Sequence, residues 1–191
     1  VLPVEFAESQ TFGPYDPCLG QAVTIDGPLH NEIPQPPAHD NGTLWVPDFS
    51  PDHYRRLLFD TGPDGGIGAV RTDLYGGDGV DLSGLTMANY YLEQSEGQFL
   101  VQGDVEDWSQ LPASIGEYGA DACGTDGRDG ANGPRWRLAR DAAAALAARE
   151  PAFDWYKYDT DNDGYVDHLM VVWAGKGQDF VGGTPENSFK V

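Results

Sequence analysis

Three segments of the chain carry apolar residues at helical spacing, three or four positions apart. In residues 50–60, Ser50 is a suitable N-cap and Pro51 suits the first helical position. Residues 85–97 end at a glycine, and residues 134–151 are bounded by prolines at both ends. The spacing therefore predicts three helices. The residues that share one face of each helix are, in chain order, Tyr54, Leu57 and Leu58; Met87, Tyr90, Tyr91 and Gln94; and Leu138, Ala142, Ala145 and Leu146.

Three other segments have the pattern of β-strands. Residues 1–6 are β-prone and mostly apolar. Residues 98–108 alternate apolar and polar side chains, with a turn or bulge expected at Gly103. Residues 168–175 contain a continuous apolar run, which is typical of a strand buried on both faces. The order strand, helix, helix, strand, helix, strand predicts an α/β (α+β) fold, a mixed sheet with packed helices.

The connections between these segments are rich in glycine, proline, aspartate and asparagine. Residues 10–49 form a Pro/Gly-rich excursion, and residues 61–83 and 119–133 are predicted to be loops. No internal repeat is present. A chain of 191 residues is long enough for one sizeable core, so we expect a single domain over residues 1–191.

The charge composition of the chain limits the kinds of molecule that it can bind. The chain has 31 acidic and 11 basic residues and a net charge of −20, which disfavours binding to nucleic acids and anionic membranes. An excess of aspartate suits a protein that binds divalent cations or one that works in salt or outside a cell. No apolar run approaches the roughly 18 residues that span a bilayer. The first residues lack the basic and apolar regions of a signal peptide, so we expect a mature or trimmed form.

Residues 159–170 match the spacing of a calcium loop, D-x-D-x-D-G. Met170 stands at the twelfth position, where an EF-hand has a glutamate, and the next residues are strand rather than helix. Converging oxygen atoms favour Ca²⁺ over Mg²⁺, and a solvated acidic turn that binds nothing is the alternative. We expect a structural site that joins the Ala-rich helix to the strand after the loop. The predicted ligands are Asp159, Asp161, Asp163, Asp167 and the carbonyl of Tyr165.

The cysteines and histidines give weaker signals. Cys18 and Cys123 form no C-x-x-C pair, so a disulfide is favoured over a cysteine zinc site, and two buried free thiols are the alternative. His168 is expected to be a hydrogen-bonded core residue and His53 a surface residue. A metal site in the Pro-rich excursion, which holds the other two histidines, is disfavoured. No H-E-x-x-H helix, G-x-S-x-G turn or P-loop occurs in the 191 residues.

Several stretches together resemble the immune inhibitor A family of zinc metalloendopeptidases, in its actinobacterial-looking form. They are "GPLHNEIP", "LWVPDFSPDHYRRLLF", "LTMANYYLEQSEGQFLVQGDVEDW", "YGADAC" and "DTDNDGYVDHLMVVWAGKGQD". The resemblance implies a zincin-like metallopeptidase domain that is stabilised by calcium, made as a precursor and secreted. It carries over the calcium ligands named above, and the Cys18–Cys123 pair fits the family pattern.

In the family, an H-E-x-x-H helix that supplies two zinc ligands and the general base follows the strand that matches residues 168–175. The 191 residues lack this motif, so no catalytic or zinc-binding residue can be assigned in this chain. The resemblance therefore implies the N-terminal half of a catalytic domain, with the C-terminal half and protein or peptide substrates as partners. Two alternatives are a calcium-dependent binding module without catalysis and a pseudoenzyme of the same family.

Overall fold

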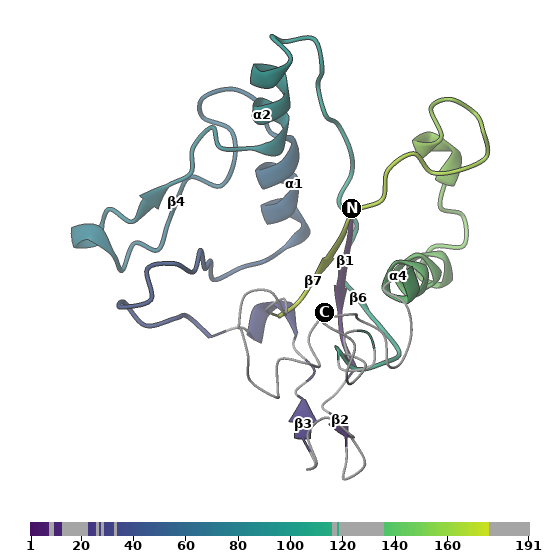
Figure 1. Ribbon diagram of the computed structural model, residues 1–191, viewed down its shortest axis with the longest axis horizontal. Coiled ribbons are helices and arrows are strands. Elements are labelled where there is room, and N and C mark those ends of the chain that lie inside the picture. Colours follow the sequence, from purple (N-terminus) through teal and green to yellow (C-terminus); the bar gives the residue numbers. More distant parts are fainter. Residues whose placement is uncertain are drawn as a thin grey trace, which may run out of the picture. The chain divides into compact units, whose positions relative to one another are not determined.

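The computed structural model describes residues 1–7, 10–12, 23–25, 27, 29–32, 34–115, 118 and 136–175 (Figure 1). The chain divides into two compact units. One comprises Val1 and Asn31–Asp107, and the other comprises Leu2–His30 and Trp108–Val191. Each unit has its own secondary structure.

The second unit is built on a parallel three-stranded sheet. β1 (Leu2–Glu5) lies in the middle, between β6 (Ser109–Gln110) and β7 (Val171–Trp173), and runs parallel to both. β1 has a strand on each side, and its Leu2, Pro3 and Val4 are all buried. The prediction of a strand at residues 1–6 is confirmed.

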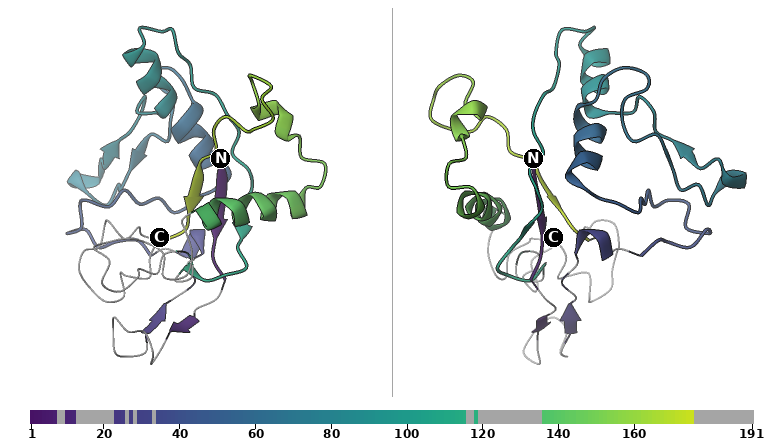
Figure 2. Two further views of the ribbon diagram at one scale, coloured as in Figure 1. Left: turned by 45° about the vertical axis from the view of Figure 1, so that its right-hand side comes forward. Right: turned by 180° about the vertical axis from the view of Figure 1, so that it is seen from behind.

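α4 (Trp136–Arg149) packs against this sheet, as Figures 1 and 2 show. Leu138, Ala142 and Leu146 are the buried side chains of the helix, and they join a core that includes Val4 and Phe6. The spacing of these three residues, four positions apart, places them on one side of the helix. The predicted helix and most of its predicted apolar face are therefore confirmed.

The first unit contains two helices with the expected caps. α1 (Pro51–Phe59) begins after Ser50, whose Oγ accepts a hydrogen bond from the His53 N–H at 3.4 Å. α2 (Met87–Gln94) begins after Thr86, whose Oγ1 accepts from the Asn89 N–H at 3.0 Å. The same hydroxyl donates to the Asp60 carbonyl at 2.7 Å, so it links the end of α1 to the start of α2.

The prediction for the buried face of α2 is wrong. Tyr90, Tyr91 and Gln94 are exposed, and Tyr90 is 58% exposed. The buried residue of the helix is Ala88, with Leu92 partly buried one turn later. A small residue allows the helix backbone to approach its neighbour closely, whereas the two tyrosines are left on the outer side.

Residues 61–83 contain more structure than the predicted loop. β4 (Ala69–Val70) and β5 (Val80–Asp81) form a short antiparallel pair around η2 (Tyr75–Gly77). The side chain of Arg71 is almost fully buried there and donates to the Asp73 carboxylate. It also donates to three backbone carbonyls of the Pro-rich excursion, those of Pro37, Asp40 and Thr43. This one guanidinium fixes the end of the excursion onto the hairpin.

The strand predicted at residues 98–108 does not form. Residues 99–108 lack regular structure, and Phe99 is exposed. A Cβ added at Gly103 would lie 2.7 Å from the Phe59 ring, so a close approach to α1, and not a bulge, accounts for the glycine. The strand that pairs with β1 is the shorter β6, which follows this segment.

The excursion of residues 10–49 is described only in part. β2 (Gln10–Phe12) and β3 (Val23–Ile25) pair antiparallel, and η1 (His30–Glu32) follows. Cys18 and Cys123 both lie outside the described residues, so their disulfide stays a prediction. No described helix is long and apolar enough to cross a membrane.

Candidate metal centre

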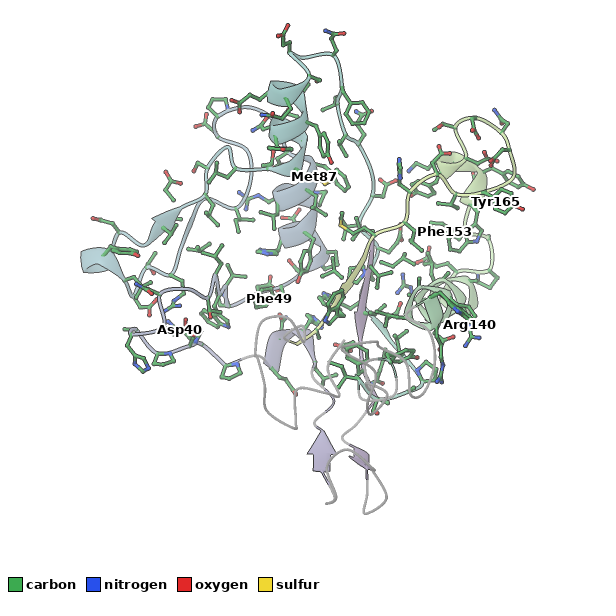
Figure 3. The ribbon with its side chains drawn as sticks, in the orientation of Figure 1. Asp40, Phe49, Met87, Arg140, Phe153 and Tyr165 are labelled. Carbon is green, nitrogen blue, oxygen red and sulfur yellow. The ribbon has the colours of Figure 1, made fainter. Side chains whose placement is uncertain are left out.

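The aspartate loop lies between η3 (Trp155–Tyr158) and β7. Backbone hydrogen bonds hold both of its ends to η3. The Asp159 N–H donates to the Tyr156 carbonyl at 3.3 Å, and the Asp167 N–H donates to the Tyr158 carbonyl at 2.9 Å. Figure 3 shows Tyr165 on the outer part of the loop, and its side chain is exposed. The loop is thus closed at its base and open to solvent at its tip.

Asp159 organises the turn from inside. It is only 8% exposed, and its two carboxylate oxygens accept hydrogen bonds from the N–H groups of Asp163 and Gly164, both at 3.0 Å. Asn162 and Gly164 have left-handed backbone conformations, with φ of +60° and +92°. Asparagine and glycine adopt that conformation at low cost, which explains why the sequence can fold back at these positions.

Three of the predicted ligands come together. One carboxylate oxygen from each of Asp159, Asp161 and Asp167 lies within 4.8 Å of the others. Carboxylate oxygens at this separation, on a loop that is open on one side, fit a hard cation such as Ca²⁺, which takes several oxygen ligands and tolerates water among them. These residues fit the implied cation.

The structure does not place the Asp163 carboxylate in this group. Its Oδ1 accepts a hydrogen bond from the Tyr165 N–H at 2.9 Å, which closes a local turn. Its N–H donates to Asp159, and to Asp161 Oδ1 at 3.2 Å. Asp163 therefore holds the shape of the loop, and its assignment as a ligand stays a prediction, as does that of the Tyr165 carbonyl.

The motif-based prediction missed Thr160. Its N–H donates to Asp167 Oδ2 at 3.0 Å, and its hydroxyl makes a short hydrogen bond to the same oxygen. These two bonds lower the pKa of Asp167, burial has a small opposing effect, and the nearby His168 lowers it further. A threonine directly after the first aspartate of the motif is the signal that could have identified this positioning role.

The predictions for His168 and its strand are wrong. His168 is exposed and is not a core residue. β7 begins three residues later and is half-buried, not buried on both faces. Within the described residues β7 is an edge strand, so only one of its sides has a neighbouring strand.

His30 is the histidine with a clear structural partner in this unit. Its Nδ1 lies 2.8 Å from Glu5 Oε2, and its ring stacks on Trp108 with ring centroids 4.4 Å apart. This arrangement holds the start of η1 against the end of β1.

The other unit contains a cavity of about 290 Å³ beside α1. His53 is half-buried there, in contrast to the surface position expected for it. Burial lowers the pKa of His53, Asp48 opposes the shift, and Arg56 adds to it. The lining residues are Val46, Pro47, Asp48, Ser50, Asp52, His53, Arg56, Ile67, Ala69 and Val70. The hydroxyl of Ser50 caps α1 by accepting a hydrogen bond from the His53 N–H.

A zinc site cannot be assigned to the described residues. In that part of the chain, the aspartate cluster is the one group of three or more potential metal ligands that lie close together. All three of its members supply carboxylates, whereas zinc sites use histidine or cysteine for most of their ligands.

Comparison with known proteins gives consistent matches. A family model described as "Immune inhibitor A peptidase M6, catalytic domain" matches residues 1–188. Immune inhibitor A of Bacillus thuringiensis subsp. alesti is 33% identical over 165 residues, which cover 81% of this chain and 22% of that protein. Pre-pro-metalloprotease PrtV of Vibrio cholerae serotype O1 is 27% identical over 152 residues, which cover 71% of this chain and 14% of that protein. The chain thus spans less than a quarter of the length of these relatives.

Proposed function

The chain belongs to the immune inhibitor A family of M6 peptidases, and from this premise we propose that it forms part of a secreted zinc metalloendopeptidase that hydrolyses peptide bonds in proteins. The observation that carries the proposal is the match of the catalytic-domain model over residues 1–188. A relative whose printed name is pre-pro-metalloprotease supports the same reaction class.

We assign Ca²⁺ to the loop of residues 159–167, with Asp159, Asp161 and Asp167 as its carboxylate ligands. The approach of their oxygens to within 4.8 Å supports this assignment. Asp163 and the Tyr165 carbonyl are the further ligands expected from the loop pattern. A bound calcium ion would offset the mutual repulsion of the carboxylates and so stabilise the connection between η3 and β7.

Zinc would supply an activated water for attack on the peptide carbonyl. We assign its ligands and the general base to a further part of the same polypeptide, because the 191 residues contain no H-E-x-x-H. The role of the present residues is then to build the sheet and the calcium loop that support that part. The C-terminal half of the catalytic domain is therefore the expected partner, with proteins or peptides as substrates.

Secretion as a precursor is part of the proposal. The words "pre-pro" in the printed name of the Vibrio relative support it. The net charge of −20 and a Cys18–Cys123 disulfide would suit an extracellular protein.

Activity of the complete gene product tests the proposal. The purified protein should cleave casein, contain about one zinc per polypeptide by elemental analysis, and lose cleavage with 1,10-phenanthroline. Added Zn²⁺ at low concentration should restore the activity. An untreated protein that contains zinc but leaves casein and other unfolded proteins intact would contradict the peptidase assignment.

A second candidate is a non-catalytic member of the family, either a calcium-dependent binding module or a pseudoenzyme. The cluster of carboxylates from Asp159, Asp161 and Asp167, which could bind a cation without any catalytic residue, is the observation that supports it. A complete gene product that binds calcium, contains no zinc after expression in zinc-supplemented medium, and does not cleave casein would support this candidate over the first.

A further inference from the structure

The last part of the Pro-rich excursion contains an asparagine directly before a glycine. Asn41 and Gly42 are both exposed, Asn41 has no regular secondary structure, and Gly42 lies at a bend. Asparagine is one of the thermolabile residues, because the backbone nitrogen that follows it can attack its side-chain amide. Glycine has no Cβ, so a following glycine hinders that attack least. The second Asn-Gly pair of the chain, Asn132–Gly133, lies outside the described residues.

The other described asparagines lack this combination. The Asn31 amide donates to one side chain and accepts from a backbone N–H, and the Asn89 amide is bonded to backbone groups at both ends. Asn162 is followed by an aspartate whose N–H already donates to two carboxylates. The side chain of Asn41 makes no hydrogen bond within the described part of the chain. Among the described asparagines, Asn41 alone has a free side-chain amide and a following glycine.

The nitrogen that would attack Asn41 lies beside a base. The Gly42 N–H donates to Asp40 Oδ1 at 3.2 Å. The Thr43 hydroxyl donates to both oxygens of the same carboxylate, at 3.1 and 2.9 Å, and so holds it in place. A carboxylate within hydrogen-bond reach of a proton can accept it. The structure therefore places an acceptor for the Gly42 proton next to an unbonded Asn41 side chain.

We propose that Asn41 is a site of spontaneous deamidation through a cyclic imide. The Gly42 nitrogen loses its proton and bonds to the Asn41 Cγ, and the side-chain nitrogen leaves with that proton as ammonia. Water then opens the ring at one of its C–N bonds. Opening at Cγ gives aspartate, and opening at the backbone carbonyl carbon gives isoaspartate, in which the main chain runs through Cγ. The net reaction consumes water, releases ammonia, adds one negative charge and raises the mass by about 1 Da.

The modification would act on the buried Arg71 guanidinium. Asn41 lies between the carbonyls of Asp40 and Thr43, which accept hydrogen bonds from Arg71 Nη1 at 2.7 and 2.9 Å. Isoaspartate adds a carbon atom to the main chain between these two carbonyls, whereas aspartate leaves the main chain unchanged. The Arg71 side chain is 1% exposed, so water cannot replace an acceptor that moves away. The isoaspartyl product should therefore loosen the attachment of the excursion to Arg71.

Controlled ageing of the complete gene product tests the proposal. The protein is kept at mildly alkaline pH with 1,10-phenanthroline, which suppresses any peptidase activity, and samples are digested and analysed by mass spectrometry with fragmentation. We expect the peptide with Asn41 to gain about 1 Da in a first-order process. This reaction should be roughly tenfold or more faster than at Asn31 and Asn89, whose side-chain amides are bonded. Labelling by isoaspartyl methyltransferase should identify isoaspartate at residue 41.

Gly42→Ala is the matched control. A Cβ at Gly42 would lie 3.9 Å from Asp40 Oδ1, which is ordinary van der Waals contact, and the residue does not have a left-handed φ, so the variant should fold normally. Its methyl group should slow the deamidation of Asn41 roughly tenfold or more. Equal rates in the wild type and the variant would overturn the mechanism.

The site itself would be overturned by an Asn41 that stays intact or reacts no faster than the two bonded asparagines, whether or not Asn132 reacts. A failure of casein cleavage alters none of these readings. The deamidation proposal and the peptidase proposal therefore fail separately.

A second experiment separates the effect of charge from that of main-chain length. The aged isoaspartyl form is isolated by ion exchange and compared with fresh Asn41→Asp, which has the same charge and a normal main chain. All proteins carry Asn132→Gln, so that the second Asn-Gly pair does not contribute. We expect amide exchange in peptides that cover residues 69–73 to be roughly tenfold faster in the isoaspartyl form than in the unaged protein. Asn41→Asp should exchange like the unaged protein, and equal exchange in all three would refute the effect on Arg71.

Discussion

Calcium binding should slow backbone hydrogen exchange in the loop of residues 159–167, and Asp161→Asn should remove that response. A ligand that binds only the closed loop stabilises it by RT ln(1 + [Ca²⁺]/Kd). This is about 2.7 kcal/mol at a calcium concentration of one hundred times Kd, or roughly a 100-fold slower exchange of the amides that the loop protects. The size of the response therefore follows from occupancy alone.

In the absence of calcium, Asp161→Asn should relieve repulsion within the loop. The carboxylate oxygens of Asp159, Asp161 and Asp167 lie within 4.8 Å of one another. Two unit charges at that separation repel by roughly 0.9 kcal/mol in a water-like dielectric, before screening by salt. Asparagine keeps the side-chain oxygen that accepts from the Asp163 N–H at 3.2 Å, so the turn is retained while one charge is removed. In chelator, the variant loop should exchange no faster than the wild-type loop.

The hydrogen exchange of peptides that cover residues 156–170 is measured by mass spectrometry, in excess calcium and in EGTA. Asp154→Asn is the matched control, because Asp154 caps η3 by accepting from the Tyr156 N–H and lies outside the cluster. It should keep the full calcium response. If Asp161→Asn loosens the loop equally in calcium and in EGTA, the carboxylate has only a structural role and the calcium assignment is wrong.

Three further substitutions test the fold around the site. Leu146→Ala should cost about 3–5 kcal/mol in urea unfolding, because Leu146 is 0% exposed and a cavity would remain, whereas Ala147→Ser on the exposed side should be nearly neutral. Asp141→Asn should remove more stability at neutral pH than at pH 2. Burial raises the pKa of Asp141, but hydrogen bonds from Arg140 and Tyr118 and the charges of Arg140 and Arg137 outweigh it, so the pKa lies below 3.8 and the ionised form is favoured on folding. The stabilisation by ionised Asp141 is present above the pKa of this group in the unfolded state, and it is lost as the pH falls through its pKa in the folded state. Equal decreases in the free energy of unfolding at pH 7 and pH 2 would contradict this reasoning. Gly79→Ala should destabilise more than Gly76→Ala. Both glycines have φ near +70°, but only at Gly79 would a Cβ meet backbone, 2.3 Å from the Val70 carbonyl oxygen, and equal effects on thermal unfolding would refute this contact.

Features that depend on neighbours in the sequence were predictable. The N-cap Ser50, the spacing of Leu138, Ala142 and Leu146, and the fold of the aspartate loop are all set within one or two turns of chain. The propensity and spacing rules apply directly to such features. For the same reason, three of the predicted calcium ligands were found close together.

Features that depend on distant contacts were not predictable from pattern. The alternation of residues 98–108 matches a strand, but that segment remains irregular and the pairing with β1 falls on Ser109 and Gln110. Alternation describes how a segment could be half-buried, and it does not reveal whether a strand from a hundred residues away is beside it. Similarly, the close approach that favours Ala88 over Tyr90 on the buried face of α2 is a property of the neighbouring elements.

The candidate calcium loop and β7 are connected by only three residues. At the loop end, the Asp167 N–H is fixed to the Tyr158 carbonyl, and at the strand end the Met170 carbonyl is fixed to the Leu2 N–H. A slip of one residue in this short link would exchange the inward and outward backbone groups of β7, because alternate residues face opposite edges. The inward position of the Ala174 N–H, which donates to the Val4 carbonyl at 2.9 Å, therefore depends on a loop of defined length and shape. If calcium holds that shape, its removal should increase hydrogen exchange at the Ala174 amide as well as in the loop. Unchanged exchange at the Ala174 amide after the loop has loosened would separate the two features.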